Sequence, residues 1–125
     1  MERDSLIVAG FGYRRDASAD SLRAALAACG RAPHRLATVA GKDCSIALRE
    51  LAEELGLDIV AIPKSQLVSE QTATQSPAAS RTYGTGSVAE AAALAAAGPG
   101  ARLIIARQIS PDRMATCAMA EGDRV

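Results

Sequence analysis

The feature that most constrains the fold of this chain is the alternation of short apolar runs with helical patterns. Residues 5–11, SLIVAGF, form a continuous apolar run that is typical of a strand covered on both faces. A helical pattern follows between the N-cap Ser18 and Gly30, and further apolar runs occupy residues 34–40 and 57–62, with a second helix between them. This βαβαβ order predicts parallel strands joined by right-handed crossovers.

The second helix is expected to bury one face and to end at Gly56. Its apolar positions follow helical spacing and are Ile46, Leu48, Leu51, Ala52 and Leu55. Pro63 then begins a short helical turn that reaches about residue 70. Residues 71–80, QTATQSPAAS, are small and polar without periodicity, which predicts a long loop.

The last third of the chain predicts one helix and two strands. An alanine-rich helix spans residues 87–97, and strands are expected at 101–107 and 114–120, followed by a frayed end at 121–125. The connection between these strands is too short for a crossover helix, which favours antiparallel pairing of the last strand. We therefore expect one α/β domain over residues 1–125, a three-layer α/β/α arrangement around a mostly parallel sheet of about five strands.

The apolar composition predicts a tightly packed core of small residues. Hydrophobic residues make up 49% of the chain, but 28 of them are alanine, and Leu, Ile, Val and Phe together number only 25. The formal net charge is zero, with acidic and basic residues mixed, so charge favours neither nucleic acid nor an anionic membrane as a partner. No signal peptide or membrane span is recognisable, and a cytoplasmic location is expected.

The cysteines and the single histidine suggest neither a metal site nor a catalytic triad. Cys29, Cys44 and Cys117 lie far apart without a C-x-x-C pair, so no disulfide framework or zinc site is expected. His34 opens a strand at the end of the sheet opposite the expected ligand edge, which favours a structural role. There is no G-x-S-x-G elbow and no second histidine, and no cofactor or metal is expected.

The segment GTGSVAE, residues 84–90, admits two interpretations. Its letters match G-x-G-x-x-A of a dinucleotide fingerprint, but a polar loop precedes it instead of a strand, which argues against NAD binding. No G-x-x-x-x-G-K-[ST] motif occurs anywhere. Ser87 and Glu90 have the spacing of a capping box, which explains both residues structurally. Glycines before a helix start also leave free N–H groups for an anion, so both roles stay open.

Three cations are expected at one edge of the sheet. Arg14 and Arg15 follow the carboxyl end of the first strand, where open α/β sheets bind ligands. Lys42 lies in the corresponding loop after the second strand. Adjacent arginines in a loop are often simply solvated, but their convergence with a lysine favours an anionic ligand.

The whole chain resembles the family formed by the cobalamin biosynthesis protein CobE and the C-terminal domain of CbiG. The segments that carry the resemblance are GFGYRRDAS, TVAGKD, GTGSVAEAAAL, LIIAR and ATCAMA, which occur in the family's order. SVAEAAAL is the most specific of them, and the arginine pair is next. The sequence departs from the family pattern at Tyr13, Asp16, Ala40 and Arg107, where Cys, Gly, an acid and Lys are usual.

The resemblance implies work on a precorrin, a tetrapyrrole that carries many carboxylates. The ligand-binding residues that it and the chemistry together suggest are Gly12, Arg14, Arg15, Lys42, Gly84, Thr85, Gly86 and Ser87. Small residues at the rim would let a flat ring approach the backbone. As a hypothesis, the loop 71–80 closes over that ring.

Two functions remain open at this point. One is an accessory or carrier protein that binds a precorrin or corrin intermediate of the aerobic pathway, with other cobalamin-pathway enzymes as candidate partners. The other is a hydrolase that opens a precorrin-5A-type δ-lactone and releases a two-carbon unit, as the resemblance to CbiG implies, with Glu90 or Lys42 as catalytic proton carriers. The lack of a recognisable nucleophile and base favours the carrier.

Overall fold

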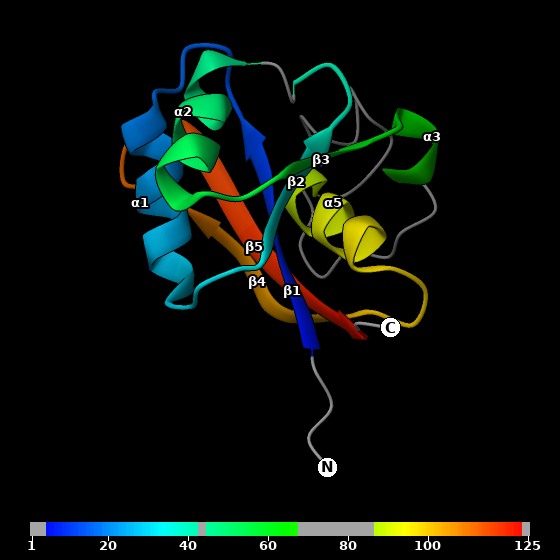
Figure 1. The fold of residues 1–125 in the computed structure, drawn as a ribbon. Coiled ribbons are helices and arrows are strands. Elements are labelled where there is room, and N and C mark those ends of the chain that lie inside the picture. The colour runs from blue at the N-terminus through cyan, green and yellow to red at the C-terminus, as the bar shows by residue number, and fades with distance from the viewer. Residues whose placement is uncertain (1–4, 43–44, 68–86, 124–125) are drawn as a thin grey trace.

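The computed structural model describes residues 5–42, 45–67 and 87–123 and arranges them in three layers (Figure 1). In chain order the elements are β1 (Ser5–Tyr13), α1 (Ala19–Cys29), β2 (Arg35–Val39), α2 (Ile46–Leu55), β3 (Ile59–Ile62), α3 (Lys64–Leu67), α5 (Val88–Ala97), β4 (Arg102–Ile109) and β5 (Ala115–Asp123). The sheet lies in the middle, with α1 and α2 on one face and α3 and α5 on the other. The predicted α/β/α architecture is confirmed.

The five strands lie in the order β3-β2-β1-β5-β4. The pairs β1–β2 and β2–β3 are parallel, whereas β5 is antiparallel to both β1 and β4. Four strands therefore point one way and β5 points the other way, as the short connection before β5 predicts. The parallel strands bring the carboxyl ends of β1 and β2, and the loops that follow them, to one edge of the sheet.

The caps of α1 and the C-cap of α2 are those that the sequence predicts, and Ser45 is the N-cap of α2. The side chains of Ser18 and Ser45 accept hydrogen bonds from the third residues beyond them, and Gly30 and Gly56 end the helices with φ values of 72° and 68°. These positive φ values lie in the left-handed region, where glycine carries no steric penalty. Local signals thus suffice to place α1 and α2.

Some boundary and burial predictions were wrong. The chain end expected to fray continues β5 instead, because Glu121, Gly122 and Asp123 pair with the first residues of β1. β1 itself runs two residues further than predicted, to Tyr13, since β5 offers it partners along its whole length. Ile46 and Leu55, expected on the buried face of α2, are 75% and 38% exposed, because they occupy the first and last helical positions, at the rim of the core.

Side chains of β1 alternate between the two faces of the sheet. Ile7, Ala9 and Phe11 pack beneath α1 and α2, whereas Val8 packs beneath α5. Both faces of the strand are therefore buried, as its continuous apolar run predicts. Thr38 adds a buried hydrogen bond from its hydroxyl to the carbonyl of Phe11, at 2.9 Å, which ties β2 to β1.

The alanine-rich helix α5 lies directly on the backbone of β1 and β5. A Cβ atom added to Gly10 would stand 2.1 Å from the carbonyl oxygen of Ala89 and 2.6 Å from the nitrogen of Ala93. At the other end of the helix, a Cβ added to Gly122 would stand 2.1 Å from the carbonyl oxygen of Ala97. The strand residues beneath α5 pair as Val8 with Ala120 and Gly10 with Ala118. Small residues on the helix and on the strands therefore permit the close approach. The core is rich in small residues, as the composition predicts.

Gly10→Ala is expected to lower the free energy of unfolding by about 3 kcal/mol or more, because backbone atoms of α5 cannot yield to the new methyl group. Gly12→Ala is the matched comparison and should cost about 1 kcal/mol, since the nearest atom to its added Cβ is a threonine hydroxyl at 3.0 Å. Urea unfolding followed by circular dichroism measures both. Equal losses would contradict the account of this packing.

Candidate functional site

Three helix N-termini and two strand ends meet at one edge of the sheet. The N-cap residues are Ser18 for α1, Ser45 for α2 and Ser87 for α5. The start of α5 lies beside the end of β1, because a Cβ added to Gly12 would be 3.4 Å from the Cβ of Val88. Helix N-termini carry partial positive charge, so their convergence makes this edge electropositive before any side chain is counted.

The predicted arginines stand at this edge in the turn after β1. Arg14 and Arg15 are both exposed. The backbone N–H of Arg14 donates to the carbonyl of Met114 at 2.9 Å, and its carbonyl accepts from the N–H of Ala17 at 3.0 Å. The backbone of the turn is thereby held between β5 and α1, while both guanidinium groups face solvent.

Lys42 and Tyr13 join the loops after β1 and β2 by reciprocal contacts. The Lys42 ammonium donates to the carbonyl of Tyr13 and lies 4.8 Å from the centre of its ring. The Tyr13 hydroxyl donates to the carbonyl of Lys42 and lies 2.7 Å from the hydroxyl oxygen of Ser45, the N-cap of α2. Tyr13, at a position where the related family usually has Cys, therefore positions Lys42. Sequence reasoning missed this role, and no local spacing signals it.

Burial and a neighbouring charge both act on the Lys42 ammonium. Partial burial and, to a lesser degree, the positive charge of Arg15 hold the pKa of Lys42 below its usual value of 10.5. The Lys42 ammonium contacts the carbonyl of Tyr13, two residues before Arg15. Arg15 and Lys42 therefore stand in neighbouring loops, after the carboxyl ends of the parallel strands β1 and β2.

Glu90 lies inside the protein and links α5 to β4. Its side chain is fully buried, and its Oε2 accepts a hydrogen bond from the backbone N–H of Arg107 at 2.8 Å. The pairing of β4 with β5 shifts register between Ile105 and Gln108, so Arg107 lies in an irregular part of the ladder. Ser87 Oγ accepts from the N–H of Glu90 at 3.3 Å, which is the serine half of the predicted capping box. The burial and this contact give Glu90 a structural role, and proton transfer by Glu90 stays a prediction.

The remaining predicted ligand residues divide into two groups. Gly12 is in place at the edge, but Thr116 and Val88 occupy the space beside its α-carbon, and Thr116 Oγ1 donates to its carbonyl at 3.0 Å. The absence of a side chain at Gly12 therefore lets α5 pack against β1. Ser87 is buried at the start of α5. Gly84, Thr85 and Gly86, and the loop 71–80, lie outside the described residues.

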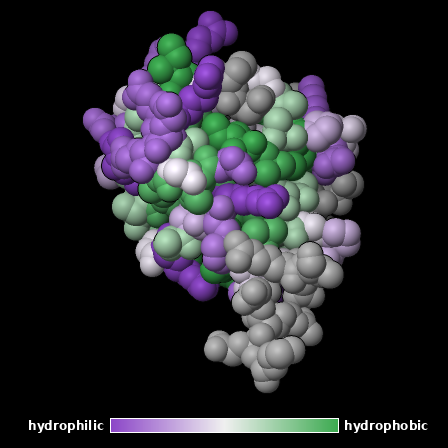
Figure 2. All heavy atoms as spheres, viewed as in Figure 1, coloured by the Kyte–Doolittle hydropathy of each residue, from purple (hydrophilic) through white to green (hydrophobic). Residues whose placement is uncertain are grey.

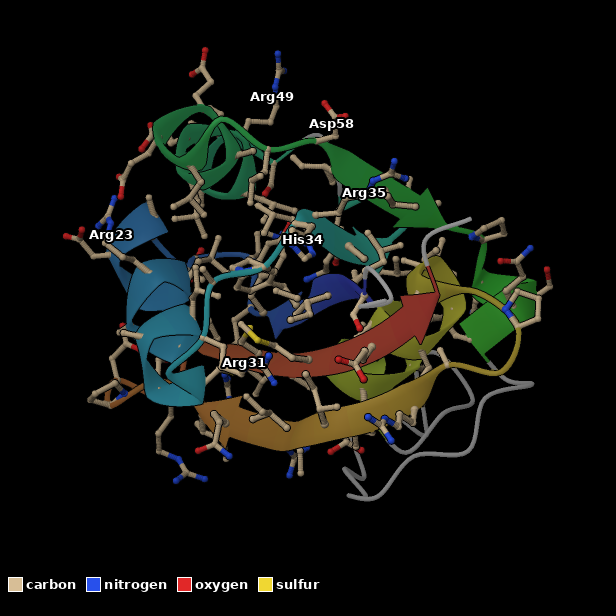
Figure 3. All side chains as sticks on the ribbon, turned by 60° about the horizontal axis from the view of Figure 1, so that its bottom comes forward. Arg23, Arg31, His34, Arg35, Arg49 and Asp58 are labelled. Carbon is tan, nitrogen blue, oxygen red and sulfur yellow. The ribbon has the colours of Figure 1, made fainter. Side chains whose placement is uncertain are left out.

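His34 stands at the opposite end of β2 and has a structural role, as predicted. The ring Nδ1 of His34 accepts a hydrogen bond from the backbone N–H of Ile7 at 2.9 Å. The backbone N–H of His34 donates to the carbonyl of Ile7 at 2.7 Å. Figure 3, in which the bottom of Figure 1 comes forward, shows His34 between Arg31 and Arg35. Within the described part of the chain, no three His, Cys, Asp or Glu residues group as metal ligands would.

Sequence reasoning also missed a polar network at this edge of the sheet. The carboxylate of Asp112 accepts from Ser110 Oγ at 2.6 Å, from Ser21 Oγ at 2.5 Å and from the N–H of Met114 at 3.0 Å. These hydrogen bonds hold the pKa of Asp112 below its usual value. They fix the β4–β5 turn to α1, beside the arginine pair. The Ser-Pro-Asp sequence of the turn is the only local signal for them.

Comparison with known proteins decides the family. The model of the family described as "Cobalamin synthesis G C-terminus" matches residues 7–120. The chain belongs to this family. It is accordingly a protein of cobalamin biosynthesis, as its resemblance to CobE and CbiG predicts. A search of the curated proteins found none that matches.

Solved structures of related proteins agree with the family and the fold. CobE, a protein from the cobalamin (vitamin B12) biosynthetic pathway, is 35% identical over 94% of this chain and 90% of its own, with a TM-score of 0.84. The cobalamin biosynthesis protein ChiG from Agrobacterium tumefaciens str. C58 is 33% identical over 95% of this chain and all of its own, with a TM-score of 0.72. A cobalamin biosynthesis protein G homolog from Sulfolobus solfataricus is 19% identical over 94% of this chain and 37% of its own, with a TM-score of 0.69, and shares the fold. No described helix of this family member is long and apolar enough to cross a membrane.

Substitutions at Glu90 test its structural role. Glu90→Gln keeps an oxygen that accepts from the Arg107 N–H and should cost about 1 kcal/mol of unfolding free energy. Glu90→Ala leaves that N–H without its acceptor and opens a cavity, so it should cost about 3 kcal/mol. Urea unfolding of both variants measures the difference, and an alanine variant as stable as the glutamine variant would contradict the role.

Proposed function

We propose that this protein binds a precorrin or corrin intermediate of the aerobic cobalamin pathway and acts as a carrier or accessory protein. The ligand would lie across the edge formed by Arg14, Arg15, Lys42 and the start of α5. The observation that carries the proposal is the gathering of these cations with three helix N-termini at one edge of the sheet. Membership of a cobalamin biosynthesis family supplies the ligand class.

The chemistry of such a ligand suits this edge. Precorrins are flat macrocycles that carry many acetate and propionate carboxylates. Each exposed guanidinium of the arginine pair can hold one carboxylate in a bidentate contact, and the Lys42 ammonium can add a point charge. N–H groups at a helix start can receive a further carboxylate. A carrier of this kind would exchange its ligand with other enzymes of the pathway, which are its candidate partners.

A hydrolase that opens a precorrin-5A-type δ-lactone is the second candidate. The observation that favours it is the lowered pKa of Lys42, since a lysine that loses its proton more readily is better suited to general acid–base work. In this reaction water would add to the lactone carbonyl and give a proton to the neutral Lys42 amine, the acyl C–O bond of the lactone would break, and the Lys42 ammonium would return the proton to the departing oxygen. The later loss of the two-carbon unit as acetaldehyde is what the family relationship to CbiG implies. Such a role requires the ammonium to leave the carbonyl of Tyr13.

Pigment binding tests the site. The double variant Arg14→Ala/Arg15→Ala should bind precorrin-5-stage and later intermediates at least about 10-fold more weakly, because two charge-assisted contacts are lost. The matched control is Arg31→Ala/Arg35→Ala, which removes two exposed arginines from the opposite edge and should bind normally. Absorption titrations measure both affinities. Equal affinity of the two double variants would contradict the proposed edge.

The same mixtures separate the two functions. A one-to-one coloured complex without release of a two-carbon product supports the carrier. Catalytic release of that product, lost in Lys42→Met and retained in the Arg31→Ala/Arg35→Ala control, would overturn the carrier in favour of the hydrolase.

A further inference from the structure

Among the described residues, β3 is the outermost strand on its side of the sheet, so that its outer side, which runs along the strand, pairs with no described strand. On its inner side, the carbonyls of Asp58 and Ile62 accept from the N–H groups of Leu36, on β2, and of Ala40, just after β2. Because neighbouring residues of a strand point their backbone groups to opposite sides, the N–H and C=O groups of Ile59 and Ala61 point away from β2. The outer edge of β3 therefore presents two donors and two acceptors at regular spacing.

The two edges of the sheet differ in how they are protected. β4, the opposite edge strand, contains two register shifts and carries the charged Arg102 and Arg107, which are common devices against edge pairing. Residues 59–62 of β3, in contrast, are all apolar. Figure 2, in the view of Figure 1, shows apolar residues gathered in the middle of this face, with hydrophilic residues among and around them. This edge is the one suited to pairing.

A hollow of about 530 Å³ lies beside the start of β3, and both apolar and charged residues line it. Residues 56–59 line it, together with one stripe of α2 at helical spacing that consists of Ile46, Arg49, Glu50 and Glu53. Ile46 is 75% exposed there, although it is a large apolar residue. The stripe thus combines an exposed apolar anchor with charges of both signs.

The charges on this stripe allow it to pair with the same stripe of a second copy of the protein. Arg49 lies within one helical turn of the acidic Glu50 and Glu53, and all three are exposed. Figure 3 shows Arg49 on α2 projecting from the same side of the molecule as Asp58 at the start of β3. If two copies of α2 lie antiparallel, the arginine of each meets the acids of the other, so the surface fits its own copy.

We infer that this surface is the interface of a homodimer, in which β3 pairs antiparallel with β3 of a second copy. A two-fold axis through Val60 places Ile59 of each copy opposite Ala61 of the other, so their outward N–H and C=O groups form four hydrogen bonds. The axis also brings the two α2 helices together over the hollow. The two sheets then form one continuous ten-stranded sheet. This inference does not depend on the proposed ligand.

Charge reversal tests the interface. Sedimentation velocity from about 10 µM to about 1 mM should show a wild-type dimer that dissociates on dilution, as a contact of this limited size implies. Arg49→Glu and the double variant Glu50→Arg/Glu53→Arg should each be monomeric, because like charges then face each other. Mixed in equal amounts, these variants should form a heterodimer, since every facing pair is again opposite in charge. The substituted residues all lie on an exposed face, so the variants should remain folded, and circular dichroism checks this.

Amide hydrogen exchange of the wild type gives a readout that needs no variant. The amides of Ile59 and Ala61 should become protected as concentration rises, whereas that of Val60, which faces β2, serves as the control and should not change. Three results would overturn the inference: a monomer throughout the concentration range, which would leave the edge to a different protein; a dimer insensitive to the reversals; or reversed variants that do not associate when mixed.

Discussion

The contact between α5 and the glycine-bearing surface of β1 and β5 is the constraint on which the rest of the structure depends. Within this contact Ala89, Ala92 and Ala93 have no exposed surface, and carbonyl oxygens of α5 stand where the Cβ atoms of Gly10 and Gly122 would be. Larger side chains on either side would lift the helix off the sheet. A core poor in large apolar residues therefore gains its packing density from close backbone approach.

This contact also positions the start of α5 at the edge where the proposed ligand would bind. Because α5 is seated against Gly12 at one end and Gly122 at the other, its N-terminus is held beside the ends of β1 and β2. Glu90, one turn into the helix, is buried against β4 and receives the N–H of Arg107. The alanine run and the buried carboxylate are thus parts of one arrangement, which presents a helix start, two arginines and Lys42 at a single edge.

The fold was predictable because its signals are local. Apolar runs, N-cap serines and cap glycines place most elements, and the short β4–β5 connection gives β5 its direction. Contacts between distant residues were not predictable: Tyr13 holds Lys42 across 29 positions, and Ser21 donates to Asp112 across 91. The same limit applies to Ile46, whose apolar character predicts burial but whose position at the first turn of α2 leaves it exposed. Arg14, Arg15 and Lys42 could be placed together because parallel strands bring their carboxyl ends to one edge.

The location of the ligand tests the central claim most directly. Amide chemical shifts of ¹⁵N-labelled protein, followed while a corrin polycarboxylate is added, report which backbone groups the ligand meets. The account predicts that the largest changes occur at Arg14, Arg15, Lys42 and the first residues of α5, Val88 and Ala89. Largest changes along α2 and β3, or around His34 at the opposite edge, would contradict it.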